Sequence, residues 1–285
     1  MRWLLALLML MARMLPAAAD PVAWTVAVDA HIAGAALHYN AKAWVYSPGK
    51  QYSATIYAIG PYRSSQSNLP IVASFHDVLA REPQAAVFNG GYSDDGFYVP
   101  SGLLLVQGRV AHPMSFEKPN GQDYGLSAIV CIDPAGRLLP LHTAAFDNRT
   151  SSIKTQCSSA FQAGPFIVEN GQSAIRQTEI AKKRPPAFRT ILGFDAQGVP
   201  YLIVFTQKVH LLVAAEFLLG RPGKPGTASI RNAKTPSGLA SNTGLGLRTA
   251  INLNGDTSSV FYFRGRHFIG DASAAMPSAV ALSTP

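Results

Sequence analysis

The chain has 285 residues, of which 48% are hydrophobic and 14% are charged, and its formal net charge is +8. This composition supplies enough apolar side chains for a sizeable core and excludes an intrinsically disordered protein. The longest basic run is Lys-Lys-Arg at residues 182–184, which is too short for charge-driven binding to a nucleic acid. We therefore expect a folded protein without a nucleic-acid partner.

The first 19 residues have the organisation of a secretory signal peptide. Arg2 precedes an apolar run over residues 3–11, and three alanines at residues 17–19 end the segment. Because this run is too short to span a bilayer and no second long run follows, we expect cleavage near Asp20 and a periplasmic or secreted protein with no transmembrane segment. An uncleaved membrane anchor is the alternative, but Arg13 disfavours it.

Turn residues divide the rest of the chain into short apolar strands. An alternating strand is predicted over residues 22–29, and helices are predicted over residues 71–82 and 209–220, the second ending at Gly220. Between and around them, Gly, Pro and Asn at tight turns predict hairpins over residues 102–112, 126–141, 166–175 and 190–205. Residues 221–246 are rich in Gly, Pro, Ser, Thr and Lys, which indicates a long surface loop or lid.

These elements predict an α+β fold, a single domain of mostly antiparallel sheet with a few packed helices, over residues 20–285. The two cysteines, Cys131 and Cys157, have no histidines at a zinc-binding spacing. In an exported protein they are expected to form one structural disulfide.

Three turns interrupt strands with small polar residues. Asn89, Gly90 and Gly91 follow a strand at residues 85–88, Gly164 lies in Gln-Ala-Gly-Pro at 162–165, and Asn-Gly-Asp-Thr-Ser-Ser occupies 254–259. Glycines at a strand end allow backbone N–H groups to converge on an anion or a sugar. Each turn alone is better explained as an ordinary turn or β-bulge, but three between apolar strands favour a shared pocket.

The segments FNGGY, PSGLLLVQGR, QAGPFIVENG, FRTILGFDAQGVPYLIVF and INLNGDTSS resemble, in order and spacing, the phosphodiester glycosidase family, also called the NAGPA or DUF2233 domain. The resemblance covers residues 85–263. It implies a one-domain α+β fold, export, and a hydrolase that splits a sugar-1-phosphodiester into a sugar and a phosphate monoester. The implied partner is a carbohydrate or glycan phosphodiester. We expect no cofactor and no metal, since Asp94, Asp95 and Asp256 lack the spacing of a calcium loop.

The resemblance also implies roles for individual residues. Arg189 would grip the phosphate, because a guanidinium can bind phosphate oxygens bidentately. Asn89 and Asn254 would hold sugar or phosphate oxygens. The other substrate-binding residues expected from the three turns are Gly90, Gly91, Gly164, Gly255, Thr257, Ser258 and Ser259.

The last turn departs from the family pattern, which has Asp where this chain has Asn254. An amide cannot accept a proton at neutral pH or attack carbon usefully, so Asp256, two residues on, is expected to supply the carboxylate. Asp256, Arg189 and Asn254 are thus the predicted catalytic residues. Because of Asn254, a non-catalytic glycan or glycosyl-phosphate binding protein of the cell envelope is the first alternative, and a structural envelope module is the second.

Overall fold

The computed structural model describes residues 20–32, 35–60, 70–93, 99–115, 126–146, 150–175, 185–219, 228–234, 240–241 and 245–285. Within these ranges the chain forms three sheets, and the helices are α2 (Phe75–Arg81), α3 (Thr150–Gln156) and α5 (Leu211–Leu219), with short 3-10 turns η2 (Thr143–Ala145) and η3 (Asp256–Ser258). The predicted α+β fold is therefore confirmed. The predicted signal peptide, Asp94 and Asp95 lie outside the described residues.

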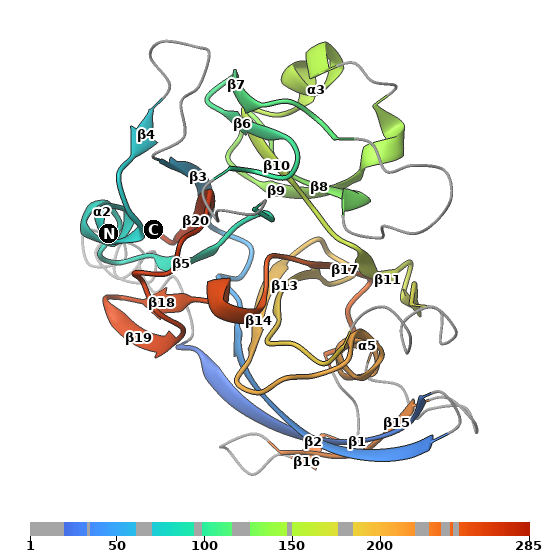
Figure 1. Cartoon of the computed structure of the whole chain (residues 1–285). Coiled ribbons are helices and arrows are strands. Elements are labelled where there is room, and N and C mark those ends of the chain that lie inside the picture. The colour runs from blue at the N-terminus through green and yellow to red at the C-terminus, as the bar shows by residue number, and fades with distance from the viewer. Residues whose placement is uncertain are drawn as a thin grey trace, which may run out of the picture.

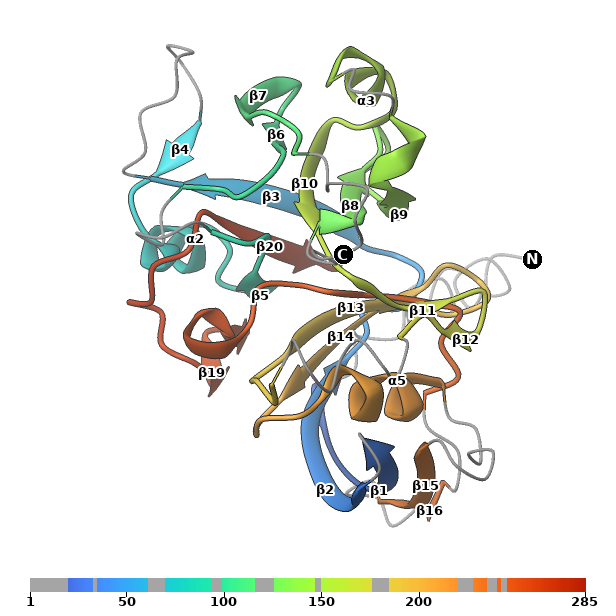
Figure 2. The same ribbon diagram turned by 45° about the vertical axis from the view of Figure 1, so that its right-hand side comes forward.

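The largest sheet has nine strands, and every pairing in it is antiparallel. Helix α5 contacts β11, β12, β1 and β15 of this sheet, as Figure 2 shows. In order across the sheet, the strands are β12 (Gln172–Ser173), β11 (Phe166–Glu169), β17 (Thr249–Asn252), β13 (Thr190–Phe194), β14 (Pro200–Phe205), β2 (Ala35–Tyr46), β1 (Val22–Ile32), β15 (Ala228–Lys234) and β16 (Ala240–Ser241).

Two smaller sheets lie beside it (Figure 1). The five-stranded sheet has the order β7 (Arg109–His112), β6 (Leu104–Val106), β10 (Ser159–Ala163), β8 (Ala128–Ile132) and β9 (Leu138–His142). The six-stranded sheet has the order β19 (Arg266–Ile269), β18 (Phe261–Phe263), β5 (Ala86–Asn89), β20 (Ser278–Ser283), β3 (Ser53–Ile59) and β4 (Ile71–Val72), with the β3–β4 pair parallel.

One hydrophobic cluster joins all three sheets. It includes Phe88 from the six-stranded sheet, Val130 from the five-stranded sheet and Leu192 from the nine-stranded sheet, each with no exposed surface. Full burial of such a side chain stabilises the fold by about 1.5–3 kcal/mol. The strand ends that carry the three polar turns are therefore anchored in a common core.

The four predicted hairpins are present, as β6–β7, β8–β9, β11–β12 and β13–β14. In the β6–β7 turn, Gln107 and Gly108 have φ of 49° and 73°, and in the β11–β12 turn Asn170 and Gly171 have φ of 51° and 69°. Successive left-handed residues match the twist of an antiparallel pair, which explains why these dipeptides predicted the hairpins correctly.

The helix expected over residues 71–82 begins later than predicted. Ser74 caps α2: its hydroxyl accepts a hydrogen bond from Asp77 N–H, and the Asp77 carboxylate accepts one from Ser74 N–H. This capping box fixes the helix start, and it leaves Ile71 and Val72 free to pair with β3 as β4. The second predicted helix is α5, whose side chains are all buried; eight of its nine residues are apolar, and the ninth is Glu216.

The expectation of a loop over residues 221–246 is wrong in part, because β15 and β16 lie within it and β15 extends the sheet along β1. An unpaired strand edge can pair with any segment that supplies backbone hydrogen bonds, even a polar one.

Helix α3 was not predicted from the sequence. Its seven residues have too little apolar periodicity, yet Ile153 is fully buried. The predicted disulfide between Cys131 and Cys157 is present and ties β8 to the end of α3. None of the helices described is long and apolar enough to cross a membrane.

Candidate functional site

The three polar turns meet in space. Asn254 N–H donates to the carbonyl of Gly90 at 3.2 Å, and Asn89 Nδ2 donates to the carbonyl of Asn254 at 2.8 Å. Gly164 N–H donates to the carbonyl of Asn252 at 2.8 Å, just before the last turn. The structure thus brings together segments that lie up to 165 residues apart, as the shared-pocket hypothesis requires.

Asn89 is the link between these segments rather than an open ligand-binding side chain. It is fully buried, and its Oδ1 accepts hydrogen bonds from Thr190 Oγ1 at 2.8 Å and from Val260 N–H at 3.2 Å. Together with the bond from Nδ2 to Asn254, these contacts use both ends of the amide. The predicted contact of Asn89 with substrate is replaced by a positioning role.

Gly90 and Gly91 are also used within the protein. Their N–H groups donate to the carbonyl and the hydroxyl of Ser278, at 2.9 and 3.2 Å. A Cβ on Gly90 would collide with the Ser278 side chain, and a Cβ on Gly91 would lie 2.6 Å from the carbonyl of Gln162. The two glycines are therefore explained by close packing, and the expected convergence of their N–H groups on an anion is not what the structure shows.

The second turn contains a cis peptide bond between Gly164 and Pro165. The hydroxyl of Tyr92 donates to the Gly164 carbonyl at 2.7 Å and also contacts Nδ2 of Asn252. With its N–H and carbonyl both engaged, Gly164 fixes the path of the chain into β11. The predicted binding role of Gly164 gives way to this structural one, and Tyr92 is a contact that sequence analysis missed.

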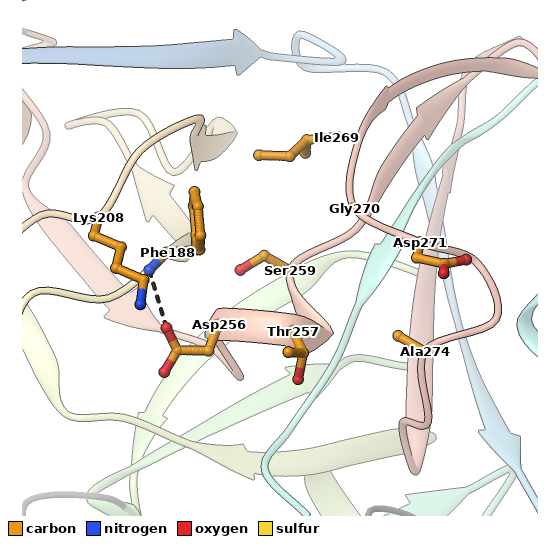
Figure 3. Close-up of a pocket in the computed structure, with 9 residues that line it drawn as sticks. All are labelled: Phe188, Lys208, Asp256, Thr257, Ser259, Ile269, Gly270, Asp271 and Ala274. Atoms are coloured by element: carbon orange, nitrogen blue, oxygen red, sulfur yellow. Dashed lines mark hydrogen bonds between the residues drawn. The ribbon is translucent and has the colours of Figure 1, made fainter.

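A pocket of about 740 Å³ opens beside the third turn (Figure 3). Asp256, Thr257 and Ser259 from the predicted set line it. The remaining lining residues come from the segments before β13 and after β14, from the end of β19 and from the loop that follows it: Phe188, Lys208, Ile269, Gly270, Asp271 and Ala274. Its walls thus combine apolar side chains with two carboxylates, one ammonium and two hydroxyls.

Asp256 is held at the wall of the pocket by two contacts with Phe188. Asp256 N–H donates to the Phe188 carbonyl at 3.0 Å, and Asp256 Oδ1 accepts from Phe188 N–H at 3.3 Å (Figure 3). Asp256 has a φ of 51°, a left-handed conformation that Asp adopts more readily than most residues. Gly255 permits the approach, since a Cβ there would lie 2.6 Å from the Phe188 carbonyl.

Two buried polar atoms in the third turn have no hydrogen-bond partner among the residues that the structure describes. They are Oγ of Ser259, which lines the pocket, and Nδ2 of Asn254, whose Oδ1 accepts from Gly255 N–H at 2.9 Å. A buried polar group without a partner is costly, so Oγ of Ser259, which borders the pocket, is suited to contact a polar ligand. Ser258, in contrast, is buried and donates to the carbonyl of Ala275 at 3.4 Å, which makes it a structural residue.

Arg189 does not line the pocket that contains Asp256. Its guanidinium is buried, with Nε donating to the Val209 carbonyl at 3.4 Å and Nη2 to the Pro185 carbonyl at 3.1 Å. Successive residues of an extended segment point to opposite sides, so Phe188 faces the pocket and Arg189 faces the other way. The predicted pairing of Arg189 with Asp256 across one pocket is therefore corrected.

Lys208 and Asp271 are pocket residues that sequence analysis missed. Lys208 follows β14, and its Nζ lies 6.0 Å from the centroid of the Phe188 ring. The hydrogen bond from Ser273 N–H to Asp271 lowers the pKa of that carboxyl group, so Asp271 is charged at neutral pH. For Lys208, the only signal in the sequence was the polar pair Gln207-Lys208 between a buried strand and a buried helix, and such pairs are common in ordinary loops.

Metal ligands are not grouped at this site or elsewhere in the described parts of the chain, where no three His, Cys, Asp or Glu residues could share an ion.

Comparisons with known proteins agree with this fold. A model of the family described as "Phosphodiester glycosidase" matches residues 82–223, which include Asn89, Arg189 and Lys208 and end before the third turn. Curated protein sequences give no match.

Among solved structures, the chain is similar to the zebrafish N-acetylglucosamine-1-phosphodiester alpha-N-acetylglucosaminidase (NAGPA) catalytic domain auto-inhibited by its pro-peptide. The TM-score is 0.58 with 15% identity, covering 93% of this chain and 85% of the zebrafish chain. It is also similar to a hypothetical protein from Synechocystis, with a TM-score of 0.50 and 12% identity over 94% of this chain and 64% of that one. Residues 82–223 thus match the phosphodiester glycosidase family, as the sequence predicts, and the fold is similar to that of the zebrafish catalytic domain.

Proposed function

We propose that this protein is an exported hydrolase that cleaves a sugar-1-phosphodiester into a free sugar and a phosphate monoester. The observation that carries the proposal is the position of Asp256, a carboxylate on the wall of a 740 Å³ pocket, beside the hydroxyls of Thr257 and Ser259. This volume lies within the range of about 300–1,000 Å³ that is typical of small-molecule sites. Phe188 and Ile269 offer apolar surface to the carbon faces of a sugar ring.

The chemistry needs only one carboxylate at the reacting carbon. Water attacks the anomeric carbon, the bond from that carbon to the phosphate oxygen breaks, and the phosphate monoester leaves with the electron pair. Asp256 accepts the proton of the attacking water and passes it to solvent. Because a phosphate monoester is a good leaving group, the reaction needs less acid assistance than hydrolysis of an ordinary glycoside.

The turnover test uses the purified chain from Asp20 onward and a panel of methyl esters of sugar 1-phosphates, with released methyl phosphate as the readout. Replacing Asp256 with Asn should lower kcat by roughly 10²–10⁴-fold, the range for loss of a general base. Asp195→Asn is a matched control, because Asp195 accepts turn hydrogen bonds from Gln197 and Val199 through Oδ1, which an Asn can also do. Wild-type turnover in the Asp256→Asn variant would remove the proposed base.

The second candidate is a non-catalytic glycosyl-phosphate binding protein, favoured by Asn254, an amide at the position where the resemblance to the family implies Asp. It predicts that the same esters raise the melting temperature of the wild type in a concentration-dependent manner while no methyl phosphate is released. Turnover above the level of Asp256→Asn would reject it.

Export is supported by the arrangement of Arg2 and the apolar run after it, and by the disulfide between Cys131 and Cys157. Cell fractionation and the mass of the mature N-terminus test it, with Asp20 as the expected first residue. Recovery of the full-length chain in the cytoplasm would contradict it.

A further inference from the structure

The position of Arg189 leaves the phosphate of the proposed substrate without the cation that the sequence assigned to it. A phosphodiester carries one negative charge, which a binding site normally meets with a Lys, an Arg or several N–H groups. The N–H groups of Gly90 and Gly91 donate to Ser278, and the guanidinium of Arg189 donates to backbone carbonyls. The cation at the pocket must therefore come from another segment.

Lys208 is that cation by position. It is the one basic residue among those that line the pocket, it is exposed, and it has no ion-pair partner in the described parts of the chain. Figure 3 shows its side chain and the Phe188 ring on the same side of the pocket as the Asp256 carboxylate. Nζ of Lys208 lies 6.0 Å from the centroid of the Phe188 ring, at the outer limit of a cation–π contact, which favours a position of the ammonium near the pocket.

Lys208 and Asp271 carry opposite charges and lie on opposite sides of the pocket, whereas Asp256 lies on the side of Lys208 (Figure 3). Asp271 and Gly270 come from the loop after β19. A phosphate next to Asp271 would meet a like charge, but a neutral sugar could donate its hydroxyls to that carboxylate. This arrangement orients a substrate with its phosphate toward Lys208 and its sugar toward Asp271.

We propose that Lys208 binds the phosphate of the substrate and that Asp271, on the opposite wall, selects a neutral sugar over an acidic one. The inference rests on the proposed function for the identity of the ligand. It assigns Lys208 to binding, so its ammonium donates hydrogen bonds to the two non-bridging phosphate oxygens and takes no part in proton transfer. The substrate class is accordingly a phosphodiester of a neutral, hydroxyl-rich sugar.

The test compares Lys208→Met, which keeps the apolar stem without the charge, with Lys208→Arg, which keeps the charge. Loss of one charge-assisted contact at an exposed position should raise KM for the methyl phosphodiester about tenfold, with kcat changed much less. Lys208→Arg should recover most of that loss. Lys50→Met is the matched control, because Lys50 is an exposed lysine between β2 and β3 and does not line the pocket.

Ionic strength provides a readout that a structural role of Lys208 would not change. Salt at about 0.1 M shortens the electrostatic screening length to roughly 10 Å, so the wild-type KM should rise with added salt. The Lys208→Met variant should show a flatter dependence. Binding of the same esters is measured by calorimetry on the Asp256→Asn protein with and without Lys208→Met, so that affinity is obtained without turnover.

The outcomes separate this inference from the proposed function. Wild-type turnover with a KM and a salt dependence unchanged by Lys208→Met would overturn the inference and leave the hydrolase in place. Binding that Lys208→Met weakens tenfold, in a wild type that releases no product, would support the inference and overturn hydrolysis. Absence of both turnover and binding would overturn both. An ester of an acidic sugar that binds as tightly as its neutral counterpart would remove the role of Asp271.

Discussion

Replacing Asn89 with Ala should be among the most destabilising single changes near the site. The Asn89 side chain donates to the Asn254 carbonyl at 2.8 Å and accepts from Thr190 Oγ1 at 2.8 Å and Val260 N–H at 3.2 Å. Each buried partner left without a hydrogen bond costs about 1–3 kcal/mol, and partial relaxation keeps the sum toward its lower end. We therefore expect a loss of about 4 kcal/mol in the free energy of unfolding.

A double-mutant cycle with Thr190→Val separates this network from a general packing effect. Thr190→Val alone should cost about 1 kcal/mol, since Asn89 Oδ1 keeps the hydrogen bond from Val260 N–H. In the Asn89→Ala background the Thr190 hydroxyl is already without its acceptor, so the same change should cost nothing or stabilise. The coupling free energy should thus be about 1–2 kcal/mol.

Guanidinium denaturation with the disulfide intact measures these values. Trp24, which packs against Phe217 at 6.1 Å between ring centroids, and Trp44, which packs against Phe268 at 4.9 Å, report unfolding by fluorescence. An Asn89→Ala loss below about 1 kcal/mol would refute the reasoning, because a typical single hydrogen bond already contributes that much. Equal costs of Thr190→Val in both backgrounds would refute it too.

Two further changes test the packing of the pocket wall and the loss of folding stability at low pH. Gly270→Ala should lower the denaturation midpoint more than Gly265→Ala. Both glycines have a left-handed φ, of 84° and 71°, but a Cβ on Gly270 would collide with the Ser259 carbonyl, whereas Gly265 has open space around it. Equal losses in the two variants would contradict this. Burial raises the pKa of Asp133, but the hydrogen bonds and charge of Arg137 outweigh burial, and the net effect is a lowered pKa. Asp133 therefore stabilises the fold above its unfolded pKa, which is near 4, and this contribution is lost as the pH falls. Unfolding measured from pH 6 to pH 2 should therefore depend less on pH in Asp133→Asn than in the wild type, and identical profiles would show that Asp133 contributes nothing.

The parts of the fold that the sequence predicted are those encoded by local chemistry. Asn170 and Gly171 form a left-handed pair at a hairpin turn, and such pairs determine the strands on either side. Helix α3 and strand β15 escaped prediction because their stability comes from partners distant in sequence, through the buried Ile153 in one case and the edge of β1 in the other.

The candidate site, too, was predicted only in part. The meeting of the turns was predicted from their composition, yet composition does not state which atoms face a ligand. The N–H groups of Gly90 and Gly91 are taken by Ser278, a residue nearly 190 positions away along the chain. Arg189 and Lys208 both carry a positive charge, and the sequence alone does not show that the Arg189 guanidinium is buried whereas the Lys208 ammonium lies at the pocket.

Asn254 and Asp256 lie two residues apart in the third turn but differ in burial, which decides where this turn can carry a carboxylate. Asn254 is buried, with 9% of its surface exposed, and its Oδ1 already accepts from Gly255 N–H, whereas Asp256 is exposed and borders the pocket. A carboxylate at position 254 would bear the cost of removing a charge from water, and at position 256 it largely avoids that cost. The left-handed φ of Asp256 and the absence of a Cβ on Gly255 are what allow this turn to place an acid at the exposed position. We therefore expect a carboxylate at position 256, on the exposed wall of the pocket, to be better placed than one at position 254 to meet both the attacking water and solvent.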